Sequence, residues 1–543
     1  MDDPAVETLV EWREWGDAAF TEAEEAKKPL LLALSATWCD WCHEMDAETY
    51  AEPRIAAHLN DGFVPMRVDV DRHPRIRDRY NMGGFPSTVF LTPEGKLISG
   101  AGFLAQGGMR QVLDSVRRAW DSKGTSAGRV PRALQDADTP QAPLSPTIEG
   151  ELFAQLAGEF DTEHGGWGDA PKFPLARTIE FALKREQQQA IRTLDAIQSH
   201  LYDDFDGGFF RFAADADWSN PHREKVLDVN AALVRTFATA YRYTGHEEYK
   251  ETAKTSAKFL TTTLWNGEAF AGSQRPDDEY YGLPLEDRAN ADEPQVDETA
   301  FADWNGLAID ALLTLYAATG HEQSKAFAER ALRYLSDTLI ADNGAVAHFD
   351  GEESESGLLA DQARVLDALT TAMQVLGEYE SLARTVADYT IEHRRDGTSF
   401  LDGPTDGLGL LSLPLRPLDA NAEFADALLD LALLTDNDTY RTVAREAIEA
   451  FAGAADRMNV QVAGYATTAA RLTDAPLTVS VGAVGSPLHL AALQLPDHEK
   501  IVIPESDVAP GTARVTIDGE RHTVETPDEL LATVTATEQT DEE

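Results

Sequence analysis

Cysteine is nearly absent from this chain. Only Cys39 and Cys42 occur among 543 residues, which excludes the disulfide framework of a small secreted domain. No run of about 18 apolar residues is present, so we expect no membrane-spanning helix and no membrane partner. The opening sequence MDDPAVETLV lacks the basic and apolar regions of a signal peptide, and we therefore expect a cytoplasmic protein.

Basic residues are also scarce. Lysine and arginine total 46 against 94 aspartates and glutamates, which gives a formal net charge of -48. There is no basic patch that could neutralise phosphates, so we expect no nucleic-acid partner. The acids recur along segments with helical apolar spacing. This pattern favours the solvated acidic surface of a halophilic protein over a partner-binding surface or disorder.

The first 122 residues alternate between helix and strand patterns. The apolar run Leu30–Leu34 is typical of a buried strand. We expect helices at 9–26, 40–59, 76–82 and 107–122, and strands at 30–34, 63–71 and within 83–100. The resulting order, β-α-β-α-β-β-α after a leading helix, matches the thioredoxin arrangement.

The remainder of the chain has a different character. Residues 123–148 are rich in Gly, Ser and Pro and are interpreted as a linker. The following segment is almost wholly helical in pattern and is interrupted by loops rich in Gly and aromatics, such as DFDGGFFRF. No strict repeat is visible, but helices that return to such loops indicate helical hairpins in a ring or stack. Short strands, a last helix and an acidic tail end the chain.

The string CDWCH raises four chemical interpretations. It could be a redox dithiol, a c-type haem anchor, a zinc site or two buried thiols. A haem anchor needs a secretion context, and structural zinc needs about four ligands, one more than Cys39, Cys42 and His43 supply. The redox interpretation is favoured because Cys39 would lie at a helix N-terminus, where free N–H groups and the dipole stabilise a thiolate.

Neighbouring residues extend the candidate dithiol site. Trp38 would shield the pair, and Asp40 and Trp41 lie between the two thiols. Pro86 begins a predicted strand in GGFPSTVF, where thioredoxin-like folds place a cis proline that faces the dithiol. The alternative is an ordinary edge-strand proline.

Several motifs in fixed order resemble the DUF255 family of thioredoxin-domain proteins, which includes the spermatogenesis-associated members. They are ATWCDWCHEM, GGWGDAPKFP, DGGFFRF, PHREKVLDVNA, DWNGLAIDALL and GLLADQARVLDAL, and they span most of residues 10–490. The resemblance implies a multidomain chain. An α/β thioredoxin-like domain (1–122) and the linker (123–148) precede an all-α (α/α)6 toroid of the six-hairpin glycosidase type (149–490). A short α/β segment (491–543) follows.

This sequence departs from the family pattern at the dithiol. The usual CHWCH is CDWCH here, with Asp40 in place of a histidine. A carboxylate between the thiols disfavours the thiolate, so we expect a more reducing pair than the family norm. The family's PHFEKML is PHREKVL, with Arg223 and Val226 as the differing residues.

A toroid gathers loop residues around a central cavity, and aromatic faces with carboxylates and histidine suit a sugar ring. The family-matched loops supply candidates His164, Trp167, Lys172, Trp218, His222, Glu224, Asp303, Trp304, Asn305 and Asp361. Glu224 and Asp303 are the best carboxylate pair, and His222 is the best base. In the structural alternative Asp303 caps a helix and His222 binds loop backbone.

These observations lead to one main functional hypothesis and two alternatives. The main hypothesis is a thiol–disulfide oxidoreductase that acts through Cys39 and Cys42 on a protein or small-molecule disulfide, with the toroid selecting the substrate. The alternatives are a carbohydrate-active or sugar-binding protein that uses the toroid, and a non-catalytic scaffold. No cofactor and no metal are expected.

Overall fold

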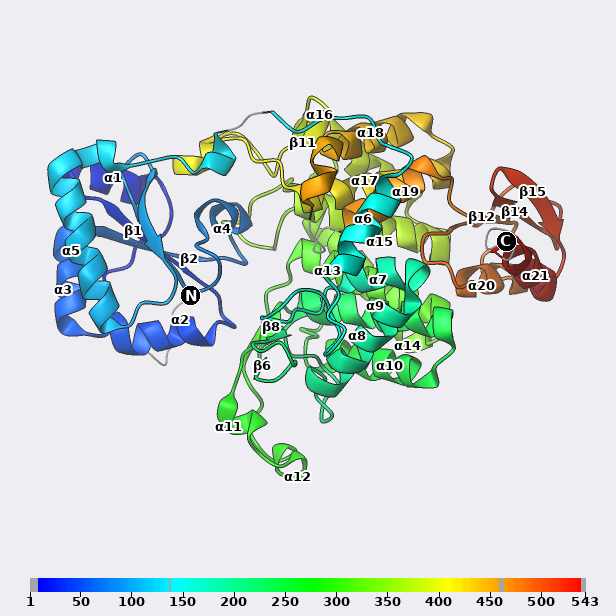
Figure 1. Cartoon of the computed structure of the whole chain (residues 1–543), viewed down its shortest axis with the longest axis horizontal. Helices are drawn as coiled ribbons and strands as arrows, with labels where there is room; N and C mark the ends of the chain where they lie inside the picture. The colour runs from blue at the N-terminus through cyan, green and yellow to red at the C-terminus, as the bar shows by residue number, and fades with distance from the viewer. Residues whose placement is uncertain (1–7, 136–137, 459–462, 539–543) are drawn as a thin grey trace. The chain divides into compact units, whose positions relative to one another are not determined.

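The computed structural model describes residues 8–135, 138–458 and 463–538. The chain divides into two compact units (Figure 1). The first contains the residues through Asp138 together with Asp402–Leu415, and the second contains Thr139–Leu401 and everything from Arg416 onward. A short segment distant in sequence is therefore part of the first unit.

A four-stranded mixed sheet forms the centre of the first unit, in the order β2-β1-β3-β4. The strands are β1 (Leu30–Ser35), β2 (Val64–Asp69), β3 (Ser87–Leu91) and β4 (Leu97–Ala101). β1 runs parallel to β2 and antiparallel to β3, and β3 is antiparallel to β4. Because β1 is central and buried on both faces, it is a continuous apolar run. This is the predicted thioredoxin-like arrangement.

Helices cover this sheet at α1 (Asp17–Ala26), α2 (Asp40–Glu44), α3 (Pro53–Gly62), α4 (Pro74–Tyr80) and α5 (Gln106–Lys123). The single helix expected at 40–59 is wrong. α2 continues as a π-helical turn to Thr49, and a new helix begins at Pro53. Proline cannot continue a helix, and the Glu52 side chain accepts a hydrogen bond from the Ile55 N–H at 2.8 Å as the new N-cap.

The segment Asp402–Leu415 packs on α4 within the first unit. The Asp402 carboxylate is buried and accepts from Arg79 at 2.5 and 3.0 Å and from Arg75 at 3.2 Å. Tyr80 donates to Gly95 O at 2.8 Å, and its hydroxyl accepts from the Leu410 N–H at 2.9 Å. Burial raises the pKa of Tyr80. Both arginines are themselves buried, so Asp402 supplies the compensating charge in this core.

Six helices of the second unit form a closed inner ring. They are α7 (Ala176–Arg185), α9 (Leu227–Thr244), α13 (Ala302–Thr319), α15 (Leu359–Leu376), α17 (Leu418–Thr435) and α19 (Ala463–Thr473). Each packs against the next, and α19 packs back against α7. α13 is buried on nearly all sides, as expected of a helix that is apolar around most of its circumference.

An outer helix backs each inner one. The outer helices are α6 (Ile148–Gly158), α8 (Gln187–His200), α10 (Glu247–Thr262), α14 (Glu322–Tyr334), α16 (Glu380–Arg394) and α18 (Asp438–Glu449). α6, the first toroid helix along the chain, packs against α19, the last inner helix, and so closes the sixth hairpin. The predicted (α/α)6 toroid is therefore present.

Four inner helices share one device at their N-termini. Near the start of each, a side-chain amide holds backbone of the preceding loop. Asn305 accepts from Phe270 N and donates to Phe270 O, both at 2.9 Å. Asn230 and Asn421 do the same for Phe209 and Phe400, and Gln362 accepts from Val346 N. This repeat was not recognised in the sequence.

The C-terminal part of the second unit is a small α/β layer. Its sheet has the order β13-β12-β14-β15, with β12 (Thr478–Val481), β13 (Ile501–Ile503), β14 (Ala513–Ile517) and β15 (Glu520–Val524), and helices α20 (Pro487–Gln494) and α21 (Pro527–Glu538). Its first strand thus precedes the expected boundary at residue 491. The acidic tail at 539–543 lies outside the described residues. Among the helices that are described, none combines the length and apolar character needed to cross a bilayer.

Candidate functional sites

The dithiol lies where β1 gives way to α2. Cys39 is the N-cap of α2, and its Sγ accepts a hydrogen bond from the Cys42 N–H at 3.2 Å. A disulfide joins Cys39 and Cys42, whose Cα atoms are 5.2 Å apart. Both side chains are buried. A helix N-terminus that already donates an N–H to sulfur would also stabilise a Cys39 thiolate in the reduced pair.

The residues around the dithiol differ in what they contact. Trp38 is buried, and its Nε1 donates to Asp71 Oδ2 at 2.7 Å. His43 Nε2 lies 2.9 Å from the carbonyl oxygen of Thr37. Asp40 is exposed, as is Trp41, and the peptide bond before Pro86 is cis.

Asp71 was missed by the sequence analysis. It is buried, and it lies two residues after the end of β2. Because β1 and β2 are parallel neighbours, their carboxyl ends meet at the same edge of the sheet, which brings Asp71 near the residues that follow β1. The final acid of FVPMRVDVD was the available signal.

The candidate residues His164, Lys172 and Trp218 make contacts within one loop region. Lys172 is buried, and its Nζ donates to Asp161 Oδ2 at 2.9 Å and to Gly168 O at 2.6 Å. Trp218 Nε1 donates to Gly165 O at 3.3 Å. His164 Nδ1 lies 3.3 Å from Asp161 Oδ2. These contacts give the region a packing role.

Trp167 packs in the same region, and its ring lies 5.5 Å from the ring of Phe160. His222 and Glu224 form a separate group. The His222 ring stacks on Phe212 at 4.1 Å between centroids. Glu224 is buried and accepts from Arg211 at 3.4 Å.

The remaining candidates lie at the N-termini of α13 and α15. Asp303 accepts from Arg364 Nη1 at 3.0 Å, and Asp361 accepts from His348 Nδ1 at 2.9 Å. Trp304 is buried, and Asn305 is occupied by the loop device described above. His348, from the loop NGAVAHFD, was not predicted.

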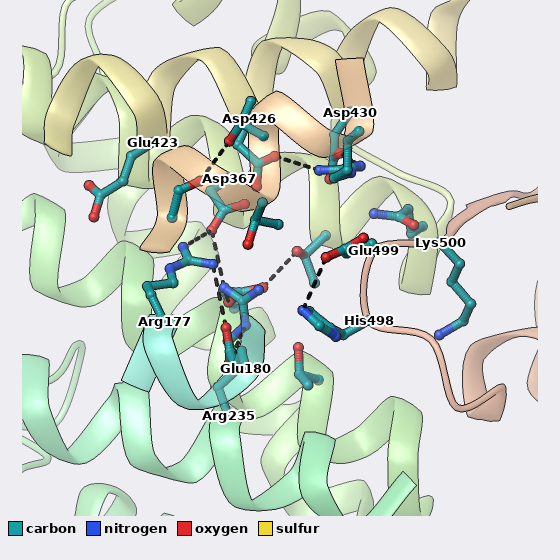
Figure 2. Close-up of a pocket in the computed structure, with 18 of the residues that line it drawn as sticks. Arg177, Glu180, Arg235, Asp367, Glu423, Asp426, Asp430, His498, Glu499 and Lys500 are labelled. Atoms are coloured by element: carbon teal, nitrogen blue, oxygen red, sulfur yellow. Dashed lines mark hydrogen bonds and ion pairs between the residues drawn. The ribbon is translucent and has the colours of Figure 1, made fainter. Parts of the chain in front are cut away.

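A polar cavity of about 270 Å³ lies among the inner helices, and none of the predicted toroid residues lines it (Figure 2). Four charged residues of the cavity lie five positions after the side-chain amides that hold the preceding loops. Counted from Asn230, Asn305, Gln362 and Asn421, they are Arg235, Asp310, Asp367 and Asp426. That common spacing was the sequence signal for the cavity.

Arginines and carboxylates alternate around the cavity. Arg235 contacts Asp310 at 2.9 Å, Glu180 at 3.3 Å and Asp367 at 3.7 Å. Arg471 contacts Asp426 at 2.6 Å and also pairs with Asp430. Arg235 contacts three carboxylates and Arg471 contacts two, so the carboxylates outnumber these two arginines.

The C-terminal layer contributes His498, Glu499 and Lys500 to the cavity wall (Figure 2). Burial lowers the pKa of Lys500 well below its usual value, and that of His498 likewise. Glu499 pairs with Arg185 at 2.7 Å and with Lys184 at 3.0 Å. This part of the wall therefore combines two nitrogen groups whose charged forms are disfavoured by burial with a paired carboxylate.

Replacement of Asp367 tests the charge excess in the cavity. Burial and the adjacent Asp310 raise the pKa of Asp367 to about 7, whereas an unfolded aspartate has a pKa of about 3.9. Between these values the folded state binds the extra proton, so this group makes the free energy of unfolding fall as pH rises from about 4 to 7. We therefore expect the free energy of unfolding of Asp367→Asn, relative to that of the wild type, to be higher at pH 8 than at pH 5. Thermal unfolding of both proteins at the two pH values measures this, and a pH-independent difference would contradict it.

Known proteins resemble the chain in parts. Residues 4–137 match the family model described as "Protein of unknown function, DUF255". The chain is 30% identical over 292 residues to "Spermatogenesis-associated protein 20" of Homo sapiens, which covers 47% of this chain and 37% of the human protein. The chain thus spans well under two thirds of the length of such relatives.

Other similarities are shorter or more distant. "Thiol:disulfide interchange protein DsbD 1" of Pseudomonas aeruginosa is 32% identical over 107 residues, covering 19% of this chain and 18% of that protein. "Cellobiose 2-epimerase" of Bacteroides fragilis is 26% identical over 219 residues, covering 39% of this chain and 53% of that protein. Among solved structures, "Crystal structure of sugar epimerase from ruminal bacterium" has a TM-score of 0.46 at 15% identity and covers 55% of this chain and 84% of that one.

Proposed function

Because residues 4–137 match the model of the DUF255 family, we propose that the protein is a thiol–disulfide oxidoreductase that acts through Cys39 and Cys42. The observation that carries the proposal is the hydrogen bond from the Cys42 N–H to Cys39 Sγ at the start of α2. It favours Cys39 as the thiolate and places Cys42 within reach to resolve a mixed disulfide. The similarity to DsbD 1 supports the same chemistry.

The proposed exchange transfers two electrons. The Cys39 thiolate attacks one sulfur of a substrate disulfide, and the other substrate sulfur leaves as a thiolate. The Cys42 thiolate then attacks Cys39 Sγ and releases the second substrate sulfur. The substrate is reduced to a dithiol and the protein is oxidised to the Cys39–Cys42 disulfide, which an external dithiol would reduce again.

A redox titration tests the proposal. The full chain would be equilibrated in dithiothreitol and glutathione buffers of stepped potential, and the free thiols would be counted by alkylation. We expect a reversible two-electron couple at or below the roughly -270 mV of thioredoxin. Asp40→His, which restores the family residue, should raise this potential. A dithiol that forms no disulfide at any potential would overturn the proposal.

Sugar binding by the toroid is the second candidate function. Two observations favour it, the polar cavity and the similarity to Cellobiose 2-epimerase. The aligned region of 219 residues is longer than the first unit and therefore includes part of the second. A volume of about 270 Å³ lies just below the range of drug-sized sites, about 300–1,000 Å³. It therefore suits a single sugar unit.

A sugar library examined by thermal shift would test this second function. We expect one class of sugar to raise Tm, and Glu423→Gln to remove the effect because Glu423 lines the cavity and pairs with Arg364 at 2.9 Å. Glu163→Gln is the matched control, since Glu163 lies outside the cavity lining and its side chain is exposed. If no sugar shifts Tm with the dithiol either oxidised or reduced, sugar binding is contradicted.

A further inference from the structure

Three buried side chains from three segments converge beside the N-termini of α13 and α15. Asp303 is the second residue of α13, Asp361 lies in the first turn of α15, and His348 comes from the loop before α15. Ala302 N donates to His348 O at 2.7 Å, which ties that loop to the start of α13. One potential ligand atom from each of the three side chains lies within 4.8 Å of the other two.

Asp303 has one oxygen that is satisfied and one that is not. Its Oδ2 accepts from Arg364 at 3.0 Å. Its Oδ1 is shielded from solvent and has no hydrogen-bond partner among the residues that the structure describes. The residue is only 7% exposed. A buried carboxylate oxygen without a donor is costly and calls for an explanation, such as an ion.

The negative charge around this oxygen is only partly balanced. Asp361 is 1% exposed and His348 is 3% exposed. Arg364 is shared between Asp303 and Glu423, so it does not supply a full charge to this group. A second cation at the cluster would offset the repulsion between the two aspartates.

We propose that Asp303, His348 and Asp361 bind a divalent transition-metal ion such as Zn²⁺ or Mn²⁺. One imidazole with two carboxylates is a donor set that suits metals of intermediate softness. His348 Nδ1 lies 2.9 Å from Asp361 Oδ1, so these two donor groups already face each other. The ion would join α13, α15 and the loop between α14 and α15. Neither redox exchange nor sugar binding requires it.

Metal uptake by the full chain is the direct test. Protein stripped with a chelator would be titrated with Zn²⁺ or Mn²⁺ by calorimetry, and the bound metal would be counted after gel filtration. Salt near about 1 M shortens the Debye length to about 3 Å and suppresses loose binding to the acidic surface. We expect one ion per chain and a rise in Tm when it binds.

Matched variants locate the ion. Asp303→Asn should weaken binding by about 100-fold or more, since even the loss of an outer partner costs 10–100-fold. Asp419→Asn removes the same charge at the second position of α17, outside the cluster, and should retain one ion per chain. His348→Gln serves as a second ligand variant if Asp303→Asn does not fold. Absence of a stoichiometric ion in the wild-type chain would overturn the proposal, as would unchanged affinity in a folded ligand variant.

Discussion

Cys39→Ser should abolish disulfide exchange by this protein. Serine has no thiolate to attack the substrate disulfide, and Cys42 is a buried residue inside α2. We expect turnover of a model disulfide to fall to the uncatalysed rate and no mixed disulfide to form. Non-reducing electrophoresis and a coupled reductase assay would measure both.

Cys42→Ser is the matched variant. It keeps the nucleophile at the helix N-terminus but removes the resolving thiol, so mixed disulfides through Cys39 should accumulate. Neither substitution should change secondary structure, because both residues are small and lie at the start of α2. If Cys39→Ser retains turnover, the two cysteines are not the catalytic pair.

Asp402→Asn should strongly destabilise the first unit. The substitution removes the buried carboxylate that contacts both Arg75 and Arg79. Removal of one partner from a buried ion pair costs about 3–5 kcal/mol of unfolding free energy. The exchange of oxygen for nitrogen in the side chain changes its volume little, so the loss would be electrostatic.

The measurement can be made specific to the first unit because the only cysteines of the chain, Cys39 and Cys42, lie there. Denaturant-dependent labelling of the reduced thiols would report opening of this unit alone. Asp406→Asn is the control. It lies in the same segment but is exposed, and its effect should stay within about 0.5 kcal/mol. Equal midpoints for the two variants would contradict the role given to Asp402.

The order of elements in the first unit was predictable because it depends on local signals. Strand and helix periodicities, and the apolar run that became β1, are visible within windows of about ten residues. The boundary at Pro53 was visible as well, since proline begins helices and does not continue them.

The toroid was predictable as a fold, and its candidate site residues remain a prediction. The predicted loop residues are largely occupied in holding loops together, as Lys172 and Asn305 show. The cavity residues could have been found from the five-residue offset between Asn305 and Asp310 and its counterparts in neighbouring helices. That repeat is obscured because it consists of only one amide and one charged residue per helix, at unequal intervals along the chain.

Local patterns alone established the helix and strand order of the first unit, the helical hairpins of the second and the position of the two thiols. Tertiary structure alone decided which distant charges meet. Arg79 and Asp402 are 323 residues apart in sequence, and His348 reaches Asp303 only through the packing of α13 and α15. A buried charge is tolerated only where folding delivers its partner, and no periodicity in the chain records which partner that is.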